Sequence, residues 1–382
     1  MVLIKNAFIN TITLGNIENG EILVDDNGKI AKIGNKIEAP SNVFVIDANG
    51  ALVTPGLVEA HCHIGLEEPV IGTVGSDINE QSDNLTPQLR AIDGINPMCS
   101  KFEDARNGGV TTVCATPGST NVLGGTAVAM KTFGIRVDDM IVKDPVAMKC
   151  AFGENPKNFG RQNKRAPFTR MSTANLLRNA LIEAKNYLTD KENGKSVKYD
   201  QKLEALIPVI KGEIPLKAHA HRADDIFTAI RIAKELNVGL TIDHCTEGHL
   251  IAKDLAKEGY PTLVGPTFNY TNKHELENKT FKTPNELYKA GCEVSIITDD
   301  GVTPVNKISM FAGMAVGEGL PMDEAWKAIT INPAKALGIQ DRVGSLEVGK
   351  DADIVIWDLD PLTYINAKPK YTIINGKIVY KA

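Results

Sequence analysis

Hydrophobic and polar positions follow two different patterns along this chain, and the change comes near residue 54. Before it, short alternating runs are separated by turns, and Asp25-Asp26-Asn27-Gly28 is a strong hairpin signal between two of them. No run in this part has helical spacing, so the sequence predicts a small all-β unit. Its expected strands are Val2–Asn10, Gly20–Val24, Lys29–Gly34 and Val43–Asp47.

From residue 55 onward, short apolar runs alternate with amphipathic stretches, which is typical of a parallel sheet with crossover helices. About eight strands over this length favour a closed (β/α)8 TIM barrel. The expected helices are Thr173–Leu188, Ala223–Leu236, Glu247–Glu258 and Thr283–Ala290. The expected strands are Leu57–His63, Val110–Ala115, Ala127–Lys131, Val146–Phe152, Pro215–His221, Gly239–His244, Tyr260–Gly265 and Glu293–Thr298.

After Leu337 the pattern of short strands returns, with Asn375-Gly376 as a two-residue hairpin turn. The strands expected there are Val343–Val348, Asp353–Trp357, Tyr371–Ile374 and Lys377–Tyr380. Because β-rich ends flank one barrel, the simplest arrangement packs them together. We therefore expect an α/β protein with a small β-sandwich from residues 1–54 and 341–382, and a catalytic barrel from residues 55–340.

Composition and net charge limit the kinds of molecule that this protein is expected to bind. The 382 residues carry 42 basic and 47 acidic side chains, a net charge of −5, which gives no electrostatic footprint for nucleic acid or an anionic membrane. No apolar stretch approaches the roughly 18 residues of a membrane span, and the N-terminus lacks the pattern of a signal peptide. The six cysteines are scattered without a CxxC pair. We expect a cytoplasmic protein that acts on a small molecule.

Histidines mark the ends of the predicted strands. His61 and His63 are two residues apart in a strand, so both imidazoles face the same side and can chelate one cation. The chain has only seven histidines, and His219, His221 and His244 also close apolar runs. Asp299 closes another. Barrel enzymes place their catalytic groups at such strand ends, so the pattern predicts a metal site there.

The motifs at both ends of the barrel resemble those of one known superfamily. Residues 54–63, Thr-Pro-Gly-Leu-Val-Glu-Ala-His-Cys-His, are similar to the opening motif of the amidohydrolase superfamily, with Glu59 where many members carry aspartate. Residues 331–338 and 344–353 resemble its closing motif. The run His219-Ala220-His221 and this tail look closest to the imidazolonepropionase-like and dipeptidase-like branch. The resemblance spans the whole chain.

The resemblance implies a ligand set for one or two divalent ions, zinc first, with manganese, iron or nickel as alternatives. His61 and His63 would hold one ion and His219 and His244 a second. Asp299 would contact the first ion and act as the catalytic residue. Relatives are commonly dimers or larger, so we also expect a homo-oligomer.

Many members bridge the two ions with a carboxylated lysine and others with a glutamate. Lys149 is our candidate for the bridge, because its neighbours are apolar and a desolvated lysine has a lowered pKa that lets it react with carbon dioxide. Glu154 is the rival ligand, and a site with neither would hold a single ion. His221 contacts substrate or metal, or has a structural role; His249 caps a helix or faces the pocket.

These features predict a metal-dependent amidohydrolase that breaks the C–N bond of an amide, peptide or cyclic amide with activated water. One alternative is a deaminase of an aminated ring. Deaminase members usually carry His-x-x-Glu after the fifth strand, whereas His221-Arg222-Ala223-Asp224 offers an aspartate there. The other alternative is a catalytically silent scaffold; such relatives lose metal ligands, and this chain keeps them.

Overall fold

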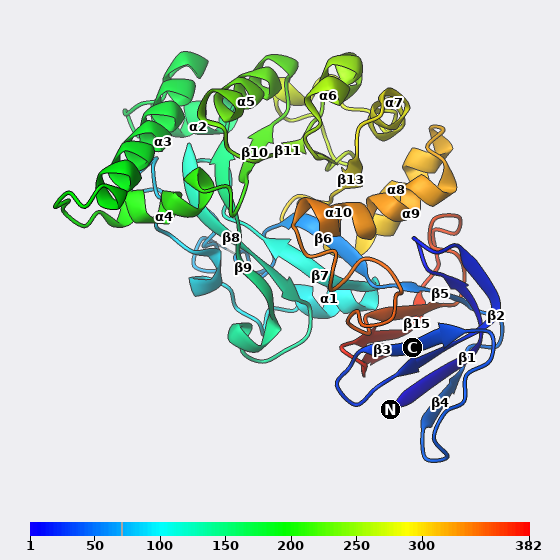
Figure 1. Cartoon of the computed structure of the whole chain (residues 1–382). Coiled ribbons are helices and arrows are strands. Elements are labelled where there is room, and N and C mark those ends of the chain that lie inside the picture. The colour runs from blue at the N-terminus through cyan, green and yellow to red at the C-terminus, as the bar shows by residue number, and fades with distance from the viewer. Residues whose placement is uncertain (70–71) are drawn as a thin grey trace.

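The computed structural model describes residues 1–69 and 72–382, and its strands form two eight-stranded sheets (Figure 1). The first, which we call the barrel sheet, has the order β13-β12-β11-β10-β9-β8-β7-β6. Each of its strands overlaps one of the predicted apolar runs. Their bounds are Leu57–Cys62 (β6), Val110–Ala115 (β7), Leu123–Lys131 (β8), Ile141–Ala151 (β9), Leu216–Ala220 (β10), Leu240–His244 (β11), Thr262–Val264 (β12) and Val294–Ile296 (β13).

The expectation of a purely parallel sheet is wrong for one strand. β8 runs antiparallel to both β7 and β9, whereas the other neighbouring pairs of the barrel sheet are parallel. The connections on either side of β8, residues 116–122 and 132–140, contain no α-helix. A chain that reverses without a crossover helix returns antiparallel to the strand it left. The fold is nonetheless TIM-barrel-like, with a nearly closed sheet.

The two outer strands of the barrel sheet, β6 and β13, are joined where they end. The amide of His63 donates to the carbonyl of Asp300 over 3.0 Å. The buried carboxylate of Glu59 accepts hydrogen bonds from the backbone N–H and the hydroxyl of Thr298, both at 2.7 Å, and from the N–H of His61 at 2.9 Å. These bonds hold His61 and His63, at the end of β6, close to Asp299, which follows β13.

Helices cover the outside of the barrel sheet (Figure 1). Local signals set several of their ends: the Asp200 carboxylate accepts from the first N–H groups of α4, and Asn237 and Gly291 end α5 and α7 in the left-handed conformation. The bounds are Lys101–Asn107 (α1), Glu154–Gln162 (α2), Arg170–Glu192 (α3), Gln201–Ile210 (α4), Ala223–Leu236 (α5), Ala252–Glu258 (α6), Thr283–Ala290 (α7), Ile308–Gly317 (α8), Met322–Ala328 (α9) and Ile331–Ala336 (α10).

Strands from both ends of the chain form the second sheet, which we call the terminal sheet. Its order is β16-β15-β14-β5-β1-β2-β3, and β4 pairs with β1 off this path. The two ends therefore come together as predicted. The bounds are Val2–Asn10 (β1), Asn16–Val24 (β2), Ile30–Gly34 (β3), Phe44–Asp47 (β4), Leu52–Pro55 (β5), Ile354–Trp357 (β14), Pro369–Ile374 (β15) and Lys377–Lys381 (β16).

Two expectations for this region need correction. The strands hydrogen-bond into one continuous sheet, so the arrangement as a sandwich of two sheets is not confirmed. The strand predicted at Val343–Val348 is wrong, because these residues form turns and bends. Gly344 has a φ of 93°, outside the extended region, and the amide of Leu346 donates instead to the carbonyl of Thr11.

A buried ion-pair network links the terminal sheet to the barrel sheet. The ammonium group of Lys131, at the end of β8, lies 2.9 Å from Asp351 and 2.6 Å from Asp353. Asp351 also pairs with Lys29, at 2.5 Å, and with Arg342, at 2.9 Å.

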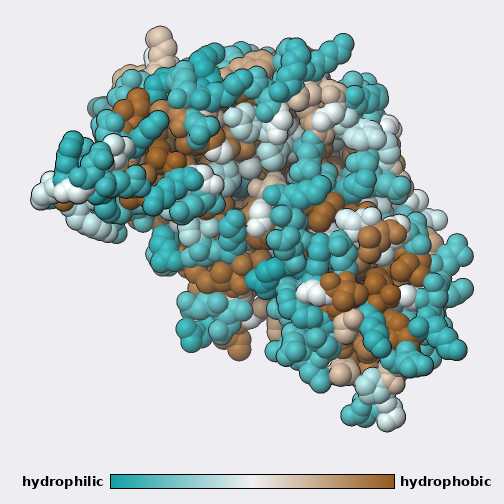
Figure 2. Space-filling view, in the orientation of Figure 1, coloured by the Kyte–Doolittle hydropathy of each residue, from teal (hydrophilic) through white to brown (hydrophobic). Residues whose placement is uncertain are grey.

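The face drawn in Figure 2 is largely hydrophilic, with apolar residues showing over the terminal sheet.

Two further findings concern the described residues. None of the helices they form is both long enough and apolar enough to cross a membrane. All six cysteines are free thiols, five of them buried and Cys292 half-buried.

Candidate metal centre

Three of the predicted ligands converge where β6 and β13 end. The ligand atoms of His61, His63 and Asp299 all lie within 4.8 Å of one another. Asp299 Oδ1 is 3.1 Å from Nε2 of His63 and 3.5 Å from Nε2 of His61. All three side chains are almost completely buried. This first group has the composition and spacing of a site for one divalent ion.

The other ring nitrogen of each histidine in the first group is held by the protein. Nδ1 of His61 is 2.5 Å from Asp243 Oδ2, and Nδ1 of His63 is 2.7 Å from the carbonyl oxygen of Thr116. Metal-binding histidines are commonly anchored in this way, which fixes the ring and leaves Nε2 as the ligand atom. Both Nε2 atoms point toward Asp299.

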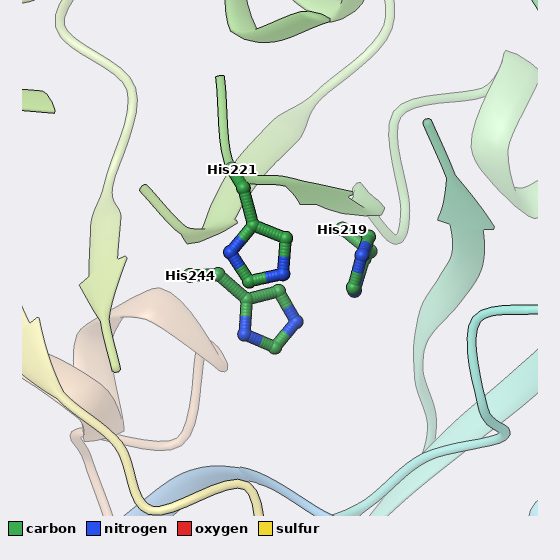
Figure 3. Close-up of side chains that lie close together, drawn as sticks. All are labelled: His219, His221 and His244. Atoms are coloured by element: carbon green, nitrogen blue, oxygen red, sulfur yellow. The ribbon is translucent and has the colours of Figure 1, made fainter. Parts of the chain in front are cut away.

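A second group of histidines lies beside the first. The ligand atoms of His219, His221 and His244, from the ends of β10 and β11, also lie within 4.8 Å of one another (Figure 3). Nδ1 of His244 is 2.8 Å from the carbonyl oxygen of Gly265, and Nδ1 of His221 is 2.8 Å from the hydroxyl of Thr246. The ring centroids of His244 and His61 are 4.8 Å apart, so the two groups are adjacent.

Two of the candidate ligands, one from each group, have a strained backbone. His244 has a φ of 73° and Asp299 a φ of 55°, in the left-handed region that residues other than glycine seldom occupy. Each such residue costs on the order of 1–3 kcal/mol, and such strain is concentrated at functional sites.

The protonation states suit a cation. Burial, the largest cause, holds the pKa of His61, His219 and His244 well below the usual histidine value and lowers that of His221 to about 4. Burial alone would raise the pKa of Asp299, but its interactions with His63 and the neighbouring imidazoles bring that pKa below its usual range. At neutral pH these four imidazoles are therefore neutral and the carboxylate of Asp299 is ionised, the forms that bind metal.

Lys149 lies at the floor of the site, on β9. Its ammonium nitrogen is completely buried and 3.2 Å from Nε2 of His61. Burial lowers the pKa of Lys149 to about 8. Among the described residues, no carboxylate oxygen lies within 4.0 Å of it, whereas the neighbouring buried Lys217 is 3.0 Å from Asp243. Lys149 is thus a buried lysine with no carboxylate in contact with its ammonium group, although the charges of Asp243 and Asp299 act on it from farther away.

Glu154, the rival bridging ligand, is hydrogen-bonded to Glu275 and belongs to neither group of ligand candidates. Its Oε1 accepts from the N–H of Glu275 at 3.0 Å, and its own N–H donates to Glu275 Oε2 at 2.9 Å. Glu275, which the sequence pattern did not single out, is 1% exposed. Its free Oε1 is 3.8 Å from Nε2 of both His219 and His221.

Of the other candidates, His249 bonds the Thr283 hydroxyl at the start of α7.

A cavity of about 260 Å³ opens beside both groups, with His63, His219, His221 and Asp299 in its wall. The rest of the wall combines polar side chains with the apolar side chains of Ile78, Leu276 and Val302. Among the described residues that line it, Lys273 carries the one cationic side chain. The other polar contributors include Asn79, Ser119, Asn155, Asn269 and Asn272. The cavity suits a small polar molecule.

Comparison with known proteins decides the family. A profile of the amidohydrolase family matches residues 201–379. The crystal structure of an amidohydrolase from Thermotoga maritima MSB8 superposes with a TM-score of 0.96 at 40% identity, covering 100% of both chains. This chain belongs to the amidohydrolase family. It is a hydrolase that acts on C–N bonds.

Curated relatives place this amidohydrolase in the imidazolonepropionase-like branch. An imidazolonepropionase of Fusobacterium nucleatum is 25% identical over 96% of this chain and 92% of its own length. The amidohydrolase tasK of Hapsidospora irregularis is 30% identical over 94% of this chain, but the chain spans only 39% of the length of tasK. The resemblance inferred from the two motifs is thereby confirmed.

Unpaired polar atoms show whether the residues of this amidohydrolase fit a metal ion. Nε2 of His219, Nε2 of His244, Oδ1 of Asp299 and Oε1 of Glu275 are all buried without a hydrogen-bond partner among the described residues. Buried polar atoms are nearly always satisfied, and leaving one unpaired costs about 1–3 kcal/mol. Such a concentration of unpaired ligand atoms in one place fits a cation-binding centre.

Proposed function

We propose that this amidohydrolase is metal-dependent and hydrolyses the C–N bond of a small amide, peptide or cyclic amide. The observation that supports this most strongly is the convergence of two adjacent ligand groups, His61–His63–Asp299 and His219–His221–His244, at one cavity. The first group would hold one divalent ion. His219 and His244 would hold a second, with zinc the preferred metal.

Lys149 would bridge the two ions as a carboxylated lysine. Its burial and the lack of a carboxylate in contact with its ammonium group favour the neutral amine, which can add to carbon dioxide. In that reaction the N–C bond of a carbamate forms and one proton is released. The product is anionic, so it would supply the negative charge that a two-ion site needs. Glu154 is the less suitable bridge, because both its N–H and its Oε1 are bonded to Glu275.

Asp299 would act as the general base and then the general acid of the reaction. A divalent ion bound here lowers the pKa of water from about 15.7 toward about 7 and polarises a carbonyl group. Asp299 Oδ1, 3.1 Å from Nε2 of His63, faces the cavity and is ionised at neutral pH. It would accept the proton of the attacking water and return it to the departing nitrogen, which leaves readily only when protonated.

The substrate would be small and polar and carry an anionic group. Among the described residues that line the cavity, Lys273 carries the one cationic side chain, and four asparagines and Glu67 line it as well. An N-acyl amino acid, a dipeptide or an imidazolone-like ring with a carboxylate meets this description. The deaminase alternative is less suitable, because Asp224, at the position where a deaminase carries its glutamate, pairs with Arg222 and is about half exposed.

A hydrolysis screen tests the proposal. Dipeptides, N-acyl amino acids and cyclic amides would be offered to zinc- and manganese-loaded protein, with release of amine or ammonia measured. Asp299→Asn should fold and lower kcat for any substrate found by about 100- to 10,000-fold, the usual contribution of an acid–base group. An Asp299→Asn variant with wild-type kcat would remove the role of Asp299. A wild-type protein that cleaves no C–N bond in its metal-loaded state would count against the substrate class.

Two further expectations stay predictions. We expect a homo-oligomer, which light scattering of the purified protein would test. We also expect a cytoplasmic location, which fractionation of the source cells would test.

A further inference from the structure

We propose that Glu275 is a ligand of the second cation, which it would share with His219. The inference rests on the proposed function and extends its ligand set to a residue outside the barrel strands. Glu275 lies in the short 3-10 turn His274–Leu276, between β12 and α7. Neither the opening nor the closing motif of the chain includes it.

The carboxylate of Glu275 is fixed in place on one side and free on the other. Oε2 accepts from the N–H of Glu154, and the N–H of Glu275 donates to Glu154 Oε1, so two reciprocal bonds join residues 121 positions apart. Oε1 has no hydrogen-bond partner among the described residues. The nearest cationic group, Lys273 Nζ, is 3.7 Å away, beyond the roughly 2.7–2.9 Å of a charge-assisted hydrogen bond.

The distances suit a shared ion. Oε1 of Glu275 lies 3.8 Å from Nε2 of His219, and neither atom has another partner among the described residues. Zinc–nitrogen and zinc–oxygen bonds of about 2.1 Å at a tetrahedral angle separate two ligand atoms by about 3.4 Å. A shift of a few tenths of an ångström would bring the pair to that separation.

Ring orientations explain why a carboxylate is needed. His219 lies edge-on to His221 and to His244, with interplanar angles of 84° and 68°, whereas His221 and His244 are stacked at 22° (Figure 3). An imidazole binds a cation in the plane of its own ring, so two stacked rings cannot both direct their lone pairs at one ion. The three histidines therefore supply two good ligands to a single ion and leave its shell incomplete.

Charge balance points to the same residue. The first group contains the carboxylate of Asp299, whereas the second consists of three histidines and no carboxylate. A buried dication without enough countercharge is costly, and a bridging carbamate on Lys149 would share its single negative charge between two dications. Glu275 is the carboxylate within 4.0 Å of His219 and His221 among the described residues.

The test compares Glu275→Gln with Glu277→Gln, a matched control from the same loop. Glu277 is 48% exposed and pairs with His274 at the surface, 3.2 Å away. Each protein would be stripped with a chelator and titrated with zinc, and bound zinc measured by elemental analysis. Replacement of zinc by cobalt(II) would report the ligand field through its visible absorption. Wild type and Glu277→Gln should bind two ions per chain. Glu275→Gln should bind the second at least about tenfold more weakly, with altered cobalt absorption.

Thermal unfolding separates a ligand from a merely structural residue. Without metal, Glu275→Gln should be at least as stable as wild type, because the substitution removes a buried, unpaired carboxylate oxygen and keeps an acceptor for the Glu154 N–H. With zinc, it should gain less stability than wild type. Equal affinity of Glu275→Gln and wild type for both ions would overturn the inference, as would a wild type that binds one ion. In the latter case hydrolysis by the one-ion protein would leave the proposed function standing.

Discussion

At the scale of single residues, a neighbouring carboxylate distinguishes two buried lysines of this site. Lys149 and Lys217 are both completely buried on neighbouring strands of the barrel sheet. Lys217 is 3.0 Å from the carboxylate of Asp243, whereas Lys149 has no carboxylate oxygen within 4.0 Å among the described residues. Burial lowers the pKa of Lys149 to about 8, which favours its neutral amine.

This difference predicts which lysine is carboxylated. Zinc-loaded protein prepared in 13C-labelled bicarbonate should show one carbamate carbon resonance by NMR. Lys149→Met should lose the resonance and weaken zinc binding, because methionine fills a similar volume but cannot form the carbamate. Lys217→Met is the matched control and should keep the signal. A resonance that persists in Lys149→Met would place the modification elsewhere.

The same scale shows which of the converging residues the sequence pattern singled out and which it did not. His61, His63, His219, His244 and Asp299 could be named because each closes an apolar run, and strand ends meet at one mouth. Glu275 could not, because it lies in an irregular turn of polar residues that resembles many solvated loops. Its special position follows from contacts with Glu154 and the histidines, which no local pattern encodes.

At the scale of elements, the sequence predicted which segments are strands better than how they run. Ala223–Leu236 and Thr283–Ala290 were predicted with the correct bounds, and in the structure Asn237 and Gly291 end these helices in the left-handed conformation. The antiparallel direction of β8 was missed. An alternating apolar run reads the same in either direction, and only the lack of a crossover helix on both sides of it fixes the outcome.

Closure of the barrel sheet by Glu59 leads to a prediction at this scale. Glu59→Ala would leave the N–H groups of His61 and Thr298 buried without acceptors, at about 1–3 kcal/mol each. We expect a loss of about 3 kcal/mol in the free energy of unfolding of the metal-free protein, measured with denaturant. Glu59→Gln keeps an acceptor oxygen and should lose less. Equal midpoints for Glu59→Ala and wild type would show that these bonds do not hold β6 against β13.

At the scale of the whole molecule, the terminal sheet and the barrel sheet are joined through buried charges. Lys131 of β8 pairs with Asp351 and Asp353, and Asp351 also meets Lys29 and Arg342. The sequence indicated that both ends belong together. It could not show how they attach to the barrel, because the partners of Lys131 are more than 200 residues away in the chain.

Asp351 should therefore give the protein a pH-dependent stability. Burial would raise its pKa, but Lys131, Lys29 and Arg342 together lower it from 3.8 to about 2. A lowered pKa contributes stability above the unfolded-state value, and that stability is lost as the pH falls from about 4 to about 2. At pH 7 this amounts to about 2 kcal/mol.

Asp351→Asn should lose at least this much at pH 7 and show a flatter decline of stability in acid, measured by unfolding at a series of pH values. Asp138→Asn is the control, since Asp138 pairs with Arg136 on the surface with 63% of its side chain exposed. That variant should change stability by less than about 1 kcal/mol. Equal losses in the two variants would show that the network does not stabilise the junction.

The measurement that tests the central claim most directly is a zinc titration of chelator-stripped protein, followed by C–N hydrolysis of a substrate from the screen. We predict no turnover without metal and recovery in step with bound zinc. His63→Asn, which removes a ligand of the first group, should not recover. Undiminished hydrolysis by protein shown by elemental analysis to be free of metal would contradict the account.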